Sequence, residues 1–449
     1  MLDYFKQTYS VHHYAVVTCA CAAILSAIGL VTIYSTTSAS NIDAGLSPFS
    51  DVRTQALAII GGVVLALFLS KVSLVYNWRK SLILGVWVVC FGLVCLVPIF
   101  GVEVNGAKRW LPLGPFTIQP YEFMKIAIIA MTVKILAEYR RGEIAPRDAL
   151  GRFALYVVVP LVFVFFTQSD LGTTLVCVAA LFAIAYISGI SERLLLSIVA
   201  AFIAVLVLYL FFGGDYRNDR LIFLNPWDDG QNGYGSGFNL IRSLYAIASG
   251  GLFGVGIGNS HEKYDYLYAA DNDFIFAIIC EEGGLLLGLL VIACVCLILI
   301  CCCKIAEQMN SEEQKLIVYG AAFLLAFQSF LNIGVAVGAL PTTGKPLPFV
   351  SSGGTSVLAS FLLLGLILNA VNGESARTVA DKRRDRLEVI FNRGAMQQNR
   401  TSRPRPSFTD MPVKQSNATT VRSNTRVRNL EFVSSFDRSS NIKRDRGSR

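Results

Sequence analysis

Charged residues are scarce in this sequence. Asp, Glu, Lys and Arg together make up 16% of its 449 residues, whereas hydrophobic residues make up 54%. Soluble globular domains carry charge on about a quarter of their residues, and long apolar runs like those present here are typical of membrane-spanning helices. The scarcity of charge therefore excludes the soluble globular class and predicts an all-α polytopic membrane protein.

Signals for several other classes are also missing. No glycine-rich loop stands in a Walker or Rossmann context, which excludes those nucleotide sites. Most of the eleven cysteines lie in apolar runs, and the triplet Cys301-Cys302-Cys303 has neither histidines nor a CxxC spacing to suggest a metal site. The first apolar run is long enough to span and lacks a small-residue cleavage site, so we expect no cleavable signal peptide. The net charge of +8 is spread unevenly and bears on membrane topology rather than on nucleic acid.

About ten apolar stretches approach the length of about 20 residues that a spanning helix needs. They cover 14–35, 54–71, 80–100, 120–138, 152–168, 171–190, 193–213, 273–303, 315–339 and 351–371. The stretch 273–303 is too long for one straight span, and Gly283-Gly284 predicts a break or kink within it.

Lysine and arginine set the predicted orientation. They gather after the second and fourth spans and at the start of the tail, and such residues favour the cytoplasmic side. Both termini are then cytoplasmic, and the connections 36–53, 101–119, 214–272 and 340–350 lie outside. The predicted regions are a cytoplasmic N-terminus (1–13), a transmembrane domain (14–371) and a disordered basic cytoplasmic tail (372–449). The large outer loop, 214–272, lies between the seventh and eighth spans and shows helical periodicity over 238–250.

Carboxylates lie at the start of the eighth span and inside it. Asp273 stands at its mouth, and Glu281 and Glu282 follow within the apolar run. Ionisable groups at such depth are costly and usually persist because function needs them. Asp is also a favoured helix N-cap, so capping alone is the structural alternative for Asp273.

Three other outer connections carry unusual polar residues. Glu122 and Lys125 stand three residues apart on the fourth span, where they share a helix face and form either a structural or a functional ion pair. Asp170 lies in a tight turn and is placed to cap the next helix. The non-helical segment 341–349 precedes the last span, and irregular backbone at membrane depth is tolerated where it lines a cavity.

These motifs resemble those of one family. In chain order they are Arg109-Trp110 with Gln119-Pro120-x-Glu122-x-x-Lys125, Gln168-x-Asp170-Leu171-Gly172, Asn272-Asp273-Phe274-Ile275-Phe276 with Glu281-Glu282-x-Gly284, and Leu347-Pro348-Phe349-Val350-Ser351-x-Gly353-Gly354-Thr355-Ser356. Over about the first 370 residues, the chain resembles the SEDS family, the FtsW/RodA/SpoVE group of bacterial cell-wall synthases. It is more similar to FtsW than to RodA.

The resemblance implies a multi-pass enzyme of the bacterial inner (plasma) membrane. Its activity would be a peptidoglycan glycosyltransferase that polymerises lipid II, as donor and acceptor, at the outer face of the membrane during cell division. Its implied partners are a class B penicillin-binding protein transpeptidase and divisome proteins. Asp273 would be the general base, and undecaprenyl pyrophosphate the leaving group. The expected substrate-binding residues are Arg109, Glu122, Lys125, Lys345, Ser351, Gly353 and Gly354, with Asp170, Glu281 and Glu282 supporting them.

The pyrophosphate that leaves needs its charge neutralised, by cationic side chains or by a divalent cation such as Mg²⁺ or Mn²⁺. The sequence identifies no ligands for such a metal.

The chain departs from the family pattern at several positions. The usual Leu-Pro-Glu-x-His-Thr before the aspartate is replaced over 267–272, where Asp271 could restore a carboxylate, and Tyr121 and Ser352 replace other usual residues.

The alternatives are a lipid II flippase or transporter, a RodA-like elongation polymerase, and a scaffold for division proteins. The gathering of motifs on the outer side and the lack of an inverted pattern of broken helices favour a polymerase.

Overall fold

The computed structural model describes residues 2–72, 80–104, 107–114, 116–168, 170–190, 222–264 and 266–374, with a few positions between 192 and 200. The helices are α1 (Leu2–Asp43), α2 (Ser50–Lys71), α4 (Lys80–Phe100), α5 (Pro120–Arg140), α6 (Pro146–Phe153), a π-helical turn (Ala154–Val158), α7 (Val159–Gln168), α8 (Leu171–Ile187), a 3₁₀ turn (Ile222–Leu224), α11 (Phe238–Gly250), α12 (Ile275–Glu307), α13 (Glu312–Ala336) and a last helix (Gly354–Glu374). The strands are β1 (Val102–Val104), β2 (Ala107–Leu113) and β3 (Phe116–Ile118).

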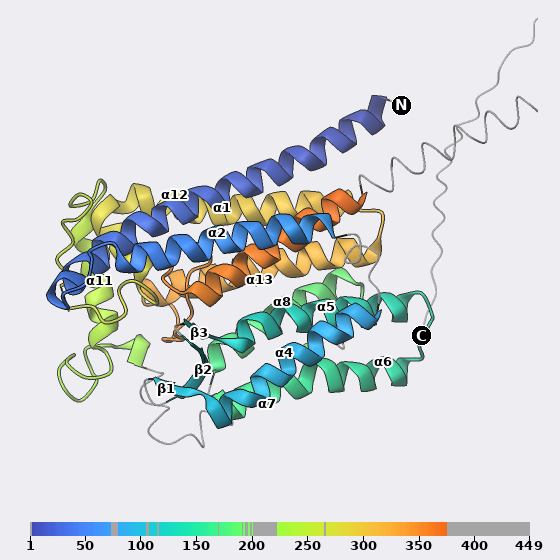
Figure 1. Ribbon diagram of the computed structural model, residues 1–449, viewed down its shortest axis with the longest axis horizontal. Coiled ribbons are helices and arrows are strands. Elements are labelled where there is room, and N and C mark those ends of the chain that lie inside the picture. The colour runs from blue at the N-terminus through green and yellow to red at the C-terminus, as the bar shows by residue number, and fades with distance from the viewer. Residues whose placement is uncertain are drawn as a thin grey trace, which may run out of the picture. The chain divides into compact units, whose positions relative to one another are not determined.

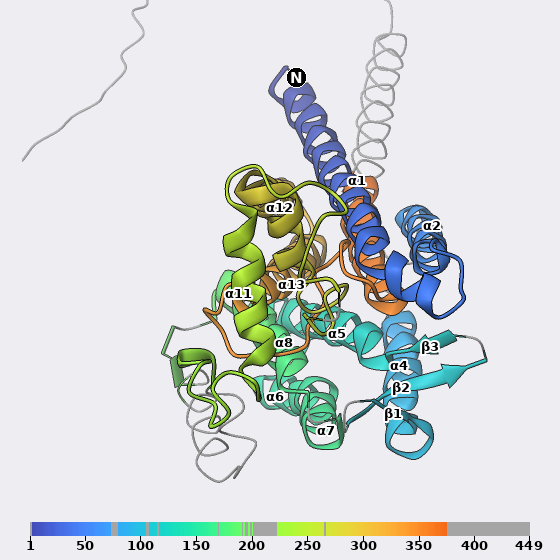
Figure 2. The same ribbon diagram turned by 90° about the vertical axis from the view of Figure 1, so that its left-hand side faces the viewer.

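The long helices form two neighbouring groups. One group holds α1, α2, α12 and α13, and the other holds α4, α5, α7 and α8, as Figures 1 and 2 both show. Contacts of α13 with α5 and α8 join the two groups. The buried apolar side chains form one core that runs through both. The bundle arises because each long apolar run forms a helix, whose backbone polar groups are satisfied internally.

Seven helices in the described part of the chain are long and apolar enough to cross a membrane: Val11–Asp43, Ser50–Lys71, Ser81–Phe100, Pro146–Gln168, Ile275–Glu307, Glu312–Ala336 and Gly354–Glu374. Two more predicted spans are helices of a different kind. The helix α5 carries five charged residues, most of them buried within the bundle, and α8 is only 17 residues long. The predicted span 193–213 and the predicted tail beyond Glu374 lie outside the described residues. The total of ten spans and the cytoplasmic termini therefore stay predictions.

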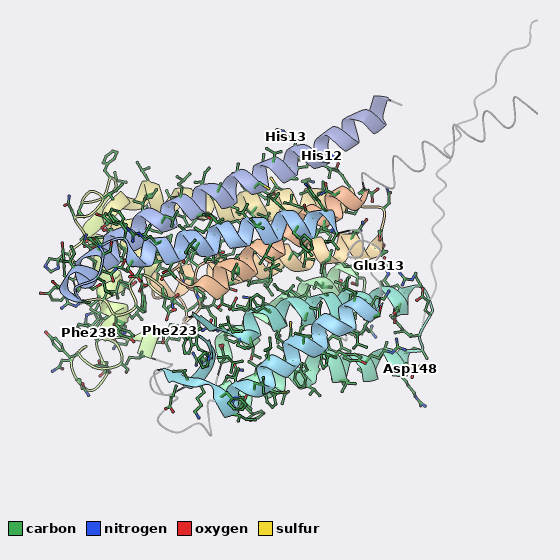
Figure 3. The ribbon with its side chains drawn as sticks, viewed as in Figure 1. His12, His13, Asp148, Phe223, Phe238 and Glu313 are labelled. Atoms are coloured by element: carbon green, nitrogen blue, oxygen red, sulfur yellow. The ribbon has the colours of Figure 1, made fainter. Side chains whose placement is uncertain are left out.

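The connections predicted to share the outer side meet at one end of the bundle. Phe223 and Phe238 of the large loop lie at this end, whereas Asp148 and Glu313 lie at the other (Figure 3). The short antiparallel sheet β1-β2-β3 lies at the same end as α11 (Figure 1). The sequence did not predict this sheet. At the opposite end, Arg140 Nη1 lies 3.2 Å from Glu312 Oε2, which ties the basic connection after α5 to the start of α13.

The helix α12 is broken at Gly284, as the glycine pair predicted. Gly284 has φ 71° and ψ −176°, so the helical hydrogen bonding stops there. The segment after α11 pairs with the broken turn, because Val255 N donates to Glu281 O at 2.9 Å and Leu285 N donates to Gly251 O at 2.9 Å. The approach is close enough that a Cβ on Gly254 would lie 2.1 Å from Glu282 O. The glycines of this segment therefore permit this close backbone contact.

Replacing Gly254 by alanine is expected to lower the unfolding temperature of the purified protein markedly. Gly254 has φ +81°, which costs a non-glycine residue about 1–2 kcal/mol, and the clash with the Glu282 carbonyl adds to that. Gly258 is the matched control, because it has φ +85° but a Cβ added there would meet nothing within 4 Å. Equal unfolding temperatures for Gly254→Ala and Gly258→Ala would contradict the close packing.

Candidate active site

A cavity of about 480 Å³ opens at the end of the bundle that carries the predicted motifs. Three separate connections and the first turns of α5 and of the last helix build its wall. The lining residues are Arg109, Trp110, Thr117, Gln119, Tyr121, Tyr268, Ala269, Asp271, Asn272, Asp273, Gly344, Pro346, Ser352, Gly353, Gly354, Thr355 and Ser356. The predicted non-helical segment before the last span thus lines a cavity, as its backbone required.

Asp273 lies in the cavity wall one residue before the N-cap of α12. Its carboxylate makes no capping bond, since Phe274 is the N-cap and no side chain caps this helix. The capping interpretation of Asp273 is therefore wrong. The atom Oδ1 is buried and has no hydrogen-bond partner among the described residues. A buried acceptor without a donor is costly to keep, and Asp273 is one of the residues that line the cavity.

Burial and the neighbouring charges together set the pKa of the Asp273 carboxyl group. Burial raises the pKa of Asp273 to about 6, with Asp271 adding to the rise and Lys345 and Arg109 opposing it. A carboxylate with such a pKa is charged at neutral pH yet basic enough to accept a proton, which suits a general base.

The backbone around Asp273 is held by hydrogen bonds from two other elements. Asn332 Nδ2 in α13 donates to Asp273 O at 2.9 Å and to Lys345 O at 2.7 Å, so it links the two segments. Ser351 Oγ donates to Asn272 O at 2.7 Å and accepts from Leu347 N at 2.7 Å. Ser351 is buried and is not among the residues that line the cavity, so its contact with substrate stays a prediction.

Lys345 is buried and is not among the residues that line the cavity. Its ammonium is 2.6 Å from Asp170 Oδ2, donates to Tyr121 OH at 2.9 Å and also bonds Thr173 Oγ1. Asp170 caps α8 as predicted, by accepting from Thr173 N at 3.0 Å. Burial would raise the pKa of Asp170, but the charges of Lys345 and Arg109 and the hydrogen bonds from Lys345 and Thr173 together hold that pKa below its usual range. The Lys345 ammonium is thus paired with the Asp170 carboxylate, and a direct contact of Lys345 with substrate stays a prediction.

Glu122 and Lys125 form a buried ion pair deeper in the bundle. Their side chains lie 2.5 Å apart, and Lys125 Nζ also donates to Gln328 Oε1 at 2.6 Å. Gln328 in turn donates to Pro346 O at 2.9 Å, on the segment that lines the cavity. Neither charged residue lines the cavity. The pair predicted from the i, i+3 spacing is present, and its role, structural or functional, stays a prediction.

Glu281 and Glu282 belong to a second polar cluster, away from the cavity wall. The Glu281 carboxylate accepts from the hydroxyl of Ser260 and from His261 N at 2.8 Å. The Glu282 carboxylate accepts from Ser35 Oγ in α1 and lies 3.7 Å from Lys263 Nζ. The two glutamates therefore tie the loop after α11 to α1 and to the broken turn of α12.

Of the predicted site residues, the structure brings Arg109, Asp273, Gly353 and Gly354 together in the cavity wall. Arg109 Nε donates to Gln168 O at 3.1 Å, which anchors the arginine on the turn that also carries Asp170. Asp271 also lines the cavity. Asp271 could restore the carboxylate of the family motif that is replaced over 267–272, but it is not among the predicted site residues. Trp110, Tyr268 and Thr355 were missed as well.

No group of three His, Cys, Asp or Glu side chains within the described ranges is arranged to hold a metal ion. Magnesium often binds through one or two carboxylates together with substrate phosphates. A divalent cation that neutralises the pyrophosphate thus stays a prediction, without assigned ligands.

The family model and the similar curated proteins all indicate one protein family. A family model described as a cell cycle protein, for FtsW, RodA and SpoVE, matches residues 15–376. The chain is 34% identical over 353 residues to stage V sporulation protein E of Bacillus subtilis, covering 77% of this chain and 93% of that protein. It is 37% identical over 350 residues to the "Probable peptidoglycan glycosyltransferase FtsW" of Synechocystis, covering 76% and 85%.

Two solved structures share the fold. One is described as "Structural coordination of polymerization and crosslinking by a peptidoglycan synthase complex", with TM-score 0.64, 26% identity, and 80% of this chain and 97% of that chain covered. The other is the rod shape determining protein RodA of Thermus thermophilus, with TM-score 0.58, 26% identity, and 80% and 96% covered.

Proposed function

The chain belongs to the FtsW/RodA/SpoVE family, and from that premise we propose that it is a multi-pass membrane glycosyltransferase that polymerises lipid II into peptidoglycan glycan strands. The single observation that carries the proposal from this chain's own residues is Asp273. Its carboxylate has a buried, unpartnered oxygen within the described part of the chain and lines a cavity shared with Arg109.

In the proposed reaction, Asp273 accepts the proton of the 4-hydroxyl of a lipid-linked GlcNAc. The hydroxyl oxygen then forms a bond to the anomeric carbon of a MurNAc on a second lipid-linked chain. The bond from that carbon to the pyrophosphate breaks, and undecaprenyl pyrophosphate leaves. General-base help of this kind contributes about 10²–10⁴-fold.

Arg109 is the proposed partner of the pyrophosphate charge. It lines the same cavity as Asp273, and a guanidinium fits phosphate oxygens with paired hydrogen bonds. Gly353 and Gly354 line the cavity and carry no side chains, so a bulky head group can lie close to the backbone there. Lys345, Lys125, Glu122 and Ser351 support the reaction through the packing of the cavity wall.

The cavity favours a polymerase over a flippase. Its lining residues come from three connections and from the first turns of α5 and of the last helix, whereas a transporter site lies near the bilayer midplane. Purified protein in vesicles separates the two activities. Strand formation from lipid II without translocation supports the proposal, and translocation without strand formation contradicts it.

A class B penicillin-binding protein transpeptidase is the proposed partner, and septal synthesis is the proposed role. The partner is supported by the similar structure described as a peptidoglycan synthase complex. The septal role is supported by relatives that carry the name FtsW. Loss of division with preserved cell width on depletion supports the septal role, and loss of rod shape supports the elongation alternative.

The rate of strand formation is expected to rise with pH through about 6 and to level off above it. Burial raises the pKa of Asp273 to about 6, with Lys345, Asp271, Arg109 and Asp170 as the other charged neighbours. The proton acceptor is the charged form, so each pH unit below 6 removes roughly nine-tenths of it. The measurement is the initial rate at saturating lipid II between pH 4.5 and 8. A rate that stays constant down to pH 4.5 would contradict Asp273 as the base.

A further inference from the structure

The segment 251–258, which follows α11, exposes an unusual set of apolar side chains. Leu252 is 58% exposed, Phe253 79%, Val255 40% and Ile257 67%. Phe253 is more exposed than any other large apolar side chain in the part of the chain that the structure describes. Apolar side chains gathered on one surface mark a contact with a membrane or with another protein.

The backbone of this segment is attached to a membrane-spanning helix. Gly256 N donates to Glu282 O at 3.1 Å, and Leu286 N donates to Leu252 O at 3.3 Å, in addition to the two bonds described above. The segment therefore runs along α12 at its break. Irregular backbone enters a bilayer only where its polar groups are paired in this way.

The exposed apolar surface continues from the segment onto α12. Leu285, Leu286, Leu289 and Leu290 are between 44% and 54% exposed, and they follow directly after the break. The two surfaces are neighbours because Leu285 and Leu286 are the residues whose N–H groups bond the segment. The exposed side chains of α12 and those of the segment thus form one apolar surface.

The charged groups nearby face the opposite way. Glu281 and Glu282 are buried against Ser260, Ser35 and Lys263, on the side toward α1 and the outer loop. The broken turn thus has a polar inner side and an apolar outer side. An element that faces the membrane needs this division, whereas a water-exposed loop does not need it.

The length of α12 sets the depth of the segment. The helix has 33 residues, and its part after the break, from 285 to 307, is about 35 Å long at 1.5 Å per residue. That part alone crosses a hydrocarbon core of about 30 Å. The break and the segment paired with it therefore lie at the boundary between head groups and acyl chains.

We propose that the segment 251–258 is a membrane-inserted wedge, whose side chains Leu252, Phe253, Val255 and Ile257 enter the acyl-chain region of the leaflet on the cavity side. The wedge is continuous with α11, where Ser243 Oγ donates to Ala336 O at 2.7 Å and Asn239 Oδ1 accepts from Tyr268 N at 3.3 Å. Tyr268 lines the cavity. The wedge thereby fixes the height of the cavity above the bilayer. This inference concerns bulk lipid and stands whether or not the cavity is catalytic.

The test places a tryptophan in the wedge of the full-length protein, reconstituted alone in lipid nanodiscs. The fluorescence of Phe253→Trp is compared with that of the parent, whose four tryptophans are common to both. We expect the added emission to be blue-shifted, quenched at least twofold by lipids brominated in the acyl chains, and little affected by aqueous acrylamide. Ile257→Trp is expected to behave in the same way, which provides a second position.

Tyr234→Trp is the matched control, because Tyr234 is 76% exposed in the same loop but outside the wedge. Its emission is expected to be quenched by acrylamide and not by the brominated lipids. Two results would overturn the proposal. One is acrylamide quenching of Phe253→Trp equal to that of Tyr234→Trp, which places the segment in water. The other is protection from both quenchers only when the transpeptidase is added, which makes the surface a protein contact.

Discussion

Replacing Asp273 by asparagine is expected to lower glycan-strand formation from purified lipid II by about 10²–10⁴-fold, the usual contribution of a general base. The amide keeps the size of the carboxylate but cannot accept the hydroxyl proton. The backbone contacts of Asp273 use its carbonyl, which accepts from Asn332, so the substitution leaves them in place. The variant protein is thus expected to purify and unfold like the parent, since the lost function is chemical.

Asp271 is the control for this prediction, because it lies two residues away and lines the same cavity. Burial raises the pKa of Asp271, while a hydrogen bond with the Ser352 side chain favours its charged form. That bond occupies the Asp271 carboxylate, whereas Asp273 Oδ1 has no partner in the described part of the protein. Asp271→Asn is therefore expected to lose much less activity. Full activity of Asp273→Asn, or a larger loss in Asp271→Asn, would move the base to Asp271. Both assays include the transpeptidase partner, so that its absence does not hide activity.

The sequence predicts the elements whose cause is local. The helix over 238–250 follows from its periodicity and appears with those same bounds. The break in α12 follows from two adjacent glycines in an apolar run, and the structure places it at Gly284. The Glu122–Lys125 pair follows from an i, i+3 spacing on a helix. In each case, a few neighbouring residues contain all of the physical information.

The positions of other residues depend on contacts far apart in the chain. Lys345 stands in a loop that lines the cavity, so the sequence placed its charge there. Its ammonium instead reaches Asp170 and Thr173, more than 170 residues away, because Gly172 leaves room for its side chain. A Cβ on Gly172 would lie 2.7 Å from Lys345 Cε. Likewise, Glu281 and Glu282 reach the outer loop and α1, a pairing that no local pattern encodes.

Replacing Lys345 by methionine is expected to reduce the stability of the protein by about 3–5 kcal/mol, the usual cost of leaving one partner of a buried ion pair alone. The two side chains are 2% and 1% exposed, so water does not compensate the charge that Asp170 keeps. Strand formation is also expected to fall. Gly344 borders the Asp273 carboxylate, and Asn332 links Lys345 O to Asp273 O, so movement of this loop displaces the base. Thermal unfolding in detergent and the lipid II assay measure the two effects.

Two further variants separate the buried charge from other losses. Lys304→Met breaks an exposed pair, in which Lys304 Nζ lies 2.9 Å from Glu307 Oε2 and the side chains are 49% and 52% exposed. It is expected to change the unfolding temperature little, because water screens such pairs. The double variant Lys345→Met/Asp170→Asn removes the uncompensated charge and keeps a residue that can cap α8. It is expected to unfold at a higher temperature than Lys345→Met alone. A double variant no more stable than the single one would contradict the prediction. The stability lost in Lys345→Met would then come from lost packing of the lysine side chain and not from the charge left on Asp170.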